Sequence, residues 1–130
     1  MKLLQAAAIA LVLAAGCTVC AGTAAWQRKL EFARLLSTPP RPYEDLAQVV
    51  VAEVLSDPTI KGEDQATLYK EMGKYYVELA ERASGRDALA RVTDYLGKAR
   101  DFFGKFVAHP AIKDQPKYAP EIFDTRLRAI

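Results

Sequence analysis

Two cysteines, Cys17 and Cys20, have the C-x-x-C spacing that redox, metal-binding and haem-attachment sites use. Attached haem needs a histidine directly after the second cysteine, and this position is Ala21. A structural zinc site needs about four ligands, of which two thiols supply half. The single histidine of the chain, His109, precedes a proline at a predicted helix end. The chemistry suggested by the spacing is therefore poorly supported, and no metal ligand set, cofactor site or catalytic residue is predicted.

The cysteines lie in an uncharged stretch, residues 3–25, that is long enough to cross a bilayer as a helix of about 20 residues. Small side chains recur along it at alternating intervals of three and four residues, as one stripe of a helix does. Association of membrane helices depends on close backbone approach, which small residues allow. We therefore interpret Cys17 as one more small residue of a membrane-helix packing seam. The seam comprises Ala7, Ala10, Ala14, Cys17, Ala21 and Ala24.

Three interpretations of this N-terminal stretch stay open. Ala14-Ala15-Gly16-Cys17 is close to a lipobox, which would make Cys17 a lipid anchor, although the usual leucine is displaced to Leu13. Val19-Cys20-Ala21 is an acceptable cleavage site for a signal peptide. The apolar stretch is longer than a typical signal core, and this favours the third interpretation, a retained single-pass transmembrane helix that continues to residue 37.

The rest of the chain carries charge of both signs. The sequence has 18 basic and 16 acidic residues, and all but Lys2 follow the apolar stretch. Basic and acidic side chains are interspersed, whereas a nucleic-acid module concentrates positive charge. This part contains no cysteine, so it has no thiolate metal site. No nucleic-acid or small-molecule partner is predicted.

Apolar periodicity and helix-breaking residues predict an all-α fold. A proline-rich linker at residues 38–43 separates the N-terminal helix, 1–37, from a small helical domain, 44–130. The predicted helices span residues 43–55, 64–83, 87–108 and 121–129. Gly85 is expected at positive φ in the short connection between the two long helices, which must then form an antiparallel hairpin.

The apolar positions of these helices predict the core. The second of the long helices has the most regular pattern, so we expect Leu96→Asp to bury an unpaired charge and to cost several kcal/mol. The expected core positions are Leu46, Val49, Val50 and Val54 in the first domain helix; Leu68, Met72, Tyr75, Tyr76, Leu79 and Ala83 in the next; and Leu89, Val92, Leu96, Ala99, Phe103 and Phe106 in the third.

The hairpin resembles a tetratricopeptide repeat (TPR) over about 45 residues. Tyr69, Met72, Gly73 and Tyr76 match the aromatic, large, small, aromatic pattern of the first repeat helix. The segment YLGKA, residues 95–99, is similar to the core of the second helix. The sequence departs from the repeat in its longer hairpin and in Gly104, which stands where the closing proline falls.

These features favour a protein that is not an enzyme and that acts through protein contacts. The first hypothesis is a non-catalytic, single-pass accessory subunit of a larger complex, such as an energy-converting complex of a bacterial or mitochondrial inner membrane. The second is a membrane-anchored, TPR-like adaptor that binds a soluble partner or peptide. Tyr75, Tyr95 and Phe102, which are offset from the main seams, are expected to face a partner. The side of the membrane on which the domain lies stays open.

Overall fold

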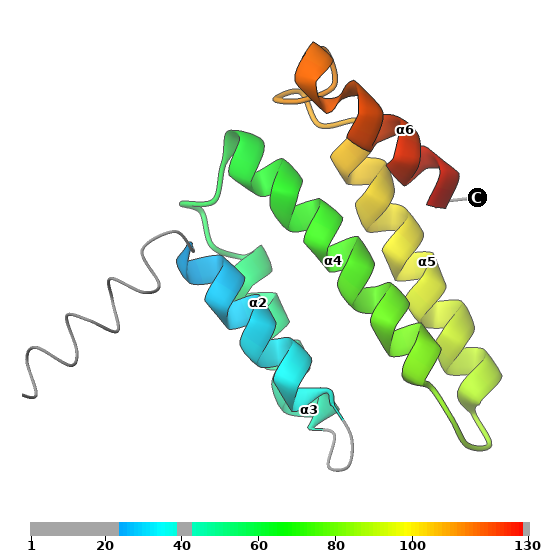
Figure 1. Cartoon of the computed structure of the whole chain (residues 1–130). Helices are drawn as coiled ribbons and strands as arrows, with labels where there is room; N and C mark the ends of the chain where they lie inside the picture. Colours follow the sequence, from blue (N-terminus) through cyan, green and yellow to red (C-terminus); the bar gives the residue numbers. More distant parts are fainter. Residues whose placement is uncertain (1–23, 39–42, 129–130) are drawn as a thin grey trace, which may run out of the picture. The chain divides into compact units, whose positions relative to one another are not determined.

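The computed structural model describes residues 24–38 and 43–128. This part of the chain is all-α, as predicted, with five α-helices and one short 3-10 helix (Figure 1). No described helix combines the length and the apolar character that a membrane crossing requires. Of the predicted membrane-spanning stretch, residues 3–25, only Ala24 and Ala25 are among the described residues. The chain divides into two compact units, residues 1–55 and 56–130.

The first unit is a pair of helices, α2 (Ala25–Leu36) and α3 (Glu44–Leu55), packed against each other. Ala33 and Ala47 are fully buried, and their small side chains let two helix backbones come close. Lys29 forms an ion pair with Glu53 across the pair. The structure thus groups α3 with α2, whereas we predicted a domain that begins at residue 44.

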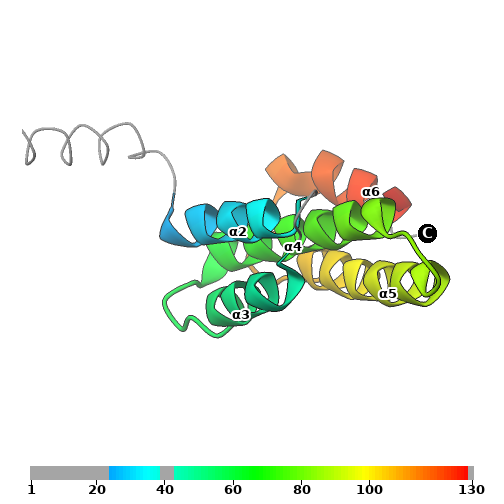
Figure 2. The same ribbon diagram turned by 90° about the horizontal axis from the view of Figure 1, so that it is seen from below.

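The second unit is built on an antiparallel hairpin of α4 (Gly62–Arg82) and α5 (Ala88–Val107). Both views show the two long helices side by side along their length (Figures 1 and 2). Gly85 turns the chain between them with φ of 96°, a left-handed conformation that glycine adopts without steric cost. The prediction for this connection is confirmed.

One end of the hairpin is covered by the 3-10 helix η1 (Pro116–Tyr118) and by α6 (Ala119–Arg128). Phe106 of α5 packs there in an apolar cluster with Ile112 and Ile122, with Ala66 of α4 completing it. His109 joins the same region to α4, because its Nε2 lies 2.9 Å from Gln65 Oε1 and its Nδ1 accepts the Ala111 N–H at 3.1 Å. We call this the closed end of the hairpin.

The predicted core is correct for most of α4, for the C-terminal half of α5 and for Val54 of α3. The predicted core residues Val50, Ala83 and Val92 are only half-buried. Leu89 and Leu96, predicted as core, are 80% and 47% exposed, because no described helix of this unit covers the loop-side half of α5. In α3 the buried positions are Ala47, Val51 and Val54, so Leu46 and Val49 are exposed instead of buried. The loop-side half of the hairpin, with Leu89, Val92 and Leu96, is its open end.

Candidate functional site

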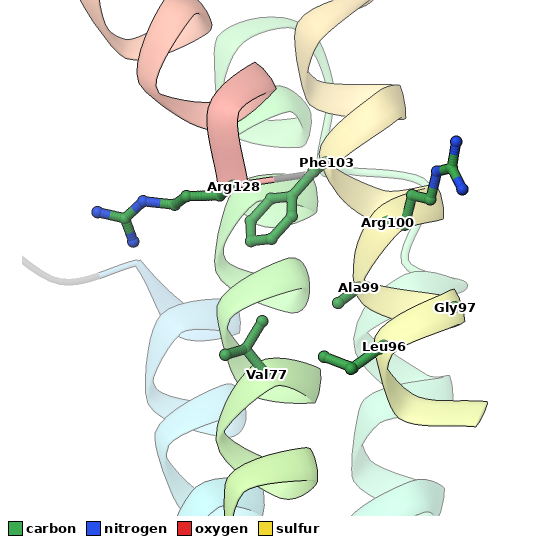
Figure 3. Close-up of a pocket in the computed structure, with 7 residues that line it drawn as sticks. All are labelled: Val77, Leu96, Gly97, Ala99, Arg100, Phe103 and Arg128. Carbon is green, nitrogen blue, oxygen red and sulfur yellow. The ribbon is translucent and has the colours of Figure 1, made fainter. Parts of the chain in front are cut away.

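A groove lies along the open half of the hairpin, between α4 and α5, and the end of α6 borders it. Its volume is about 530 Å³. Val77 of α4 and Leu96 of α5 point toward each other across it, and Phe103 lies deeper between the two helices (Figure 3). The floor is therefore apolar and open to water, which is the usual character of a protein-binding surface.

Charged side chains of both signs border the groove. Glu78 and Glu81 lie on the α4 side toward the connecting loop, whereas Lys74 and Arg128 lie toward the closed end. Arg100 belongs to the adjoining hollow and points away from Val77 (Figure 3). Lys74 and Arg128 are already held by ion pairs of 3.2 Å to Glu71 and 3.1 Å to Asp124. The two cations at this end of the groove are thus balanced by the carboxylates of Glu71 and Asp124.

The glycines inside the two helices of the hairpin differ in their surroundings. A Cβ at Gly73 would lie 2.4–2.8 Å from ring atoms of Phe103, so this glycine is required by close packing of α4 on α5. A Cβ at Gly97 or Gly104 would have no heavy atom within 4 Å. Glycine inside a helix is about 1 kcal/mol less favourable than alanine. No contact within the described residues explains why glycine instead of alanine occupies these two positions of α5.

The side chains predicted to face a partner lie mainly in the hairpin contact. Tyr75 is 1% exposed and packs edge-on to Tyr76 at 5.3 Å, which contradicts its predicted place on a partner surface. Tyr95 and Phe102 are half-buried, and their rings stack on Tyr76 at 6.1 and 5.8 Å. The contact between the two helices thus occupies one side of each ring.

The predicted seam of small residues falls outside the described residues, except for Ala24. Ala24 is exposed and immediately precedes α2. Cys17 and Cys20 are likewise outside the described part. Among the residues that the structure does describe, no group of three or more potential ligands is arranged for a metal ion.

A network of polar side chains surrounds Glu63, at the start of α4. Its carboxylate accepts hydrogen bonds from Tyr118 Oη at 2.7 Å and from Gln115 Nε2 at 3.2 Å, and Lys117 Nζ lies 3.5 Å away. These hydrogen bonds hold the pKa of Glu63 below its ordinary value of 4.5, and the bond from Tyr118 has the larger effect, followed by the bond from Gln115. The same bond to Glu63, with loss of water contact, raises the pKa of Tyr118 above 10.0. This network ties η1 to α4 and holds the closed end in place.

Sequence reasoning missed the groove, because it placed Leu96 in the core. A signal was available in Gly97 and Gly104, two glycines seven residues apart on a helix that is otherwise well formed. No protein-family model, no curated protein and no solved structure matches the chain, so its geometry alone must carry the functional argument.

Proposed function

We propose that the protein is a non-catalytic, single-pass accessory subunit of a larger membrane protein complex. One observation carries the proposal: the second unit has an ordered core but leaves large apolar side chains in water. Phe123 and Leu127, one turn apart on α6, are 66% and 55% exposed. Leu89 and Leu96 on α5 are also exposed. Such groups on small domains mark contact surfaces.

The apolar N-terminal stretch adds a second proposed contact. Its seam of small residues gains packing energy when another helix lies against it in the bilayer. The charged groups of the described helices form solvent-facing pairs, such as Lys98 with Asp94 at 3.1 Å and Lys70 with Glu121 at 2.9 Å. These pairs are typical of a solvated surface and leave the apolar faces as the natural contacts for partner subunits.

The second candidate is a membrane-anchored, TPR-like adaptor, and the groove favours it. In this candidate the hairpin is a single TPR-like unit, and the contact of Gly73 with the Phe103 ring supports this, because a small residue there brings the two helices together. The groove beside Val77 and Leu96 would take an apolar segment of a soluble partner.

Extraction from native membranes separates the two candidates. A subunit co-purifies with the same proteins in fixed ratio through a mild detergent and a high-salt wash. An adaptor exchanges or is lost. The variant Phe123→Glu/Leu127→Glu should release a subunit from its complex, while Arg126→Glu on the same helix should leave the complex intact. A protein that migrates alone from every mild detergent would contradict the subunit hypothesis.

The packing seam of small residues is tested separately by introducing larger side chains. Ala14→Leu with Ala21→Leu keeps the stretch apolar but prevents close helix approach, so native-gel migration should change. Cys17→Ala with Cys20→Ala keeps the seam small and should leave the complex intact. Loss of assembly in the alanine variant would instead support lipid or redox chemistry at these cysteines, and the mass of the intact N-terminus would identify a lipid.

A further inference from the structure

One face of α5 is exposed along about four turns and carries both large side chains and glycines. Leu89 and Leu96 are the exposed large residues of this face, and Gly97 and Gly104 leave open space. Thr93 lies between Leu89 and Leu96 in the sequence of this face. Its hydroxyl donates a hydrogen bond to the Leu89 carbonyl at 2.9 Å, so it needs no partner from another chain. Together with Arg100, these residues form what we call the α5 face: Leu89, Thr93, Leu96, Gly97, Arg100 and Gly104.

The α5 face is complementary to itself. If two α5 helices pack antiparallel about a two-fold axis midway between residues 96 and 97, Leu89 of one copy meets Gly104 of the other. Leu96 then meets Gly97, and Thr93 meets Arg100. Each exposed leucine thus shares a layer of the contact with a position that has no side chain, which leaves room for the leucine. In an isologous contact every such pairing occurs twice.

The charges agree with the same axis. Glu81 borders the groove on the loop side of Leu96, and Arg100 lies on the other side of the axis. The two-fold operation carries Arg100 of one copy to the loop side of the other copy, where Glu81 lies. Neither side chain has an ion pair within the part of the chain that the structure describes. The operation therefore brings two unpaired opposite charges together, twice.

We infer that a second copy of this chain occupies the α5 face, forming an antiparallel homodimer centred between Leu96 and Gly97. The inference goes beyond the proposed function, since it requires neither a membrane complex nor a peptide ligand. The Leu89–Gly104 pairs lie roughly 11 Å from the axis, at a rise of about 1.5 Å per residue, so a crossing angle of about 20° keeps them in contact. A contact made by one helix per copy is small, and the dimer is expected to be a weak one.

Cysteine pairing tests the register. Full-length chains with Cys17→Ala and Cys20→Ala receive either Leu89→Cys or Gly104→Cys and are oxidised in detergent micelles, separately and mixed. We expect the mixture to give at least ten times more disulfide-linked dimer than either chain alone. Parallel packing would give the dimer with the Leu89→Cys chain alone, and random collision would give similar yields in all three samples. Either result, or no cross-linking at all, overturns the inference.

Bulk at the axis gives the second test. Gly97→Leu has open space around it, so the variant should fold with a thermal midpoint equal to or above that of the parent. It should nevertheless lower the Leu89–Gly104 cross-link at least tenfold, because two leucines then collide at the axis. If the cross-link persists in a folded Gly97→Leu chain, the α5 face is not the contact.

Reversing the charges of the proposed Arg100–Glu81 ion pair, singly and together, gives the third test. Arg100→Glu and Glu81→Arg should each weaken the cross-link severalfold, since each places like charges opposite one another. The double variant should restore it, because the pair is re-formed with its signs exchanged. Arg126→Glu is the matched control, since it makes the same charge change on an exposed position outside the α5 face. A double variant no better than the single ones would contradict the proposed ion pair and the axis that predicts it.

Discussion

The closed and open ends of the α4–α5 hairpin have similar sequence patterns and very different surroundings. Apolar residues recur at intervals of three and four along the whole of α5, yet Phe103 and Phe106 are buried while Leu89 and Leu96 are exposed. Phe106 is buried by the C-terminal segment with Ile112 and Ile122, and Phe103 is buried against Gly73 of α4, whereas no such contacts among the described residues cover Leu89 and Leu96. Helix periodicity thus identifies the apolar side of a helix. Whether that side is buried within the chain or left exposed depends on the neighbouring elements.

The largest expected effect is at the closed end, with Phe106→Ala. Phe106 is 1% exposed at the centre of the cluster that joins α5 to Ile112 and Ile122. Removing a fully buried phenylalanine leaves a cavity and costs about 3–5 kcal/mol. Urea unfolding followed by circular dichroism measures this. Phe123→Ala on the exposed side of α6 is the control and should change stability by less than about 0.5 kcal/mol. Equal losses from both variants would mean that the closed end is not the core.

The glycines provide a matched pair with opposite expected signs. Gly73→Ala forces the Phe103 ring to move and should destabilise the hairpin by about 1–2 kcal/mol, even after the gain in helix propensity. Gly97→Ala meets no atom and should stabilise the monomer by about 0.5–1 kcal/mol. Thermal unfolding of the two variants beside the parent checks both signs. A stabilising Gly73→Ala would show that the two helices are less closely packed than described.

At the open end, Leu96→Asp should cost only about 1 kcal/mol, from partial loss of apolar contact and the lower helix propensity of aspartate. From the sequence alone we expected several kcal/mol, because the pattern placed this residue in the core. With 47% of the residue exposed, the carboxylate reaches water and no buried charge results. A loss as large as that of Phe106→Ala would restore the original prediction and contradict an open groove.

Much of the fold was predictable, and the reasons are local. Helix ends are set by Pro58, Gly85 and Pro110, which act through the backbone, and the observed helices end within a few residues of the predicted positions. The partners of each apolar face were not predictable in the same way. For α3, the buried side with Ala47, Val51 and Val54 is set by tertiary packing, for which the sequence of the helix has no local signal. The candidate site was missed for the same reason, since exposure of Leu96 depends on where α6 ends.

The smallest effect concerns the pH dependence of the closed end, since exposed polar contacts contribute little to stability. The pKa of Glu63 is lowered on folding, so its contribution is present above 4.5 and is lost as pH falls through the folded value. The pKa of Tyr118 is raised, so its contribution is present below 10.0 and is lost as pH rises through the folded value.

Glu63→Gln removes the charge on which both shifts depend. As the pH is lowered from neutral to acid, the difference in thermal unfolding midpoint between the parent and the variant should therefore become smaller. At alkaline pH the variant should lose stability less steeply than the parent. Tyr118→Phe should remove the alkaline change and reduce the acid change only in part, because the Gln115 bond to Glu63 is kept. Parallel pH profiles for parent and Glu63→Gln would show that the closed end is held by its apolar cluster alone.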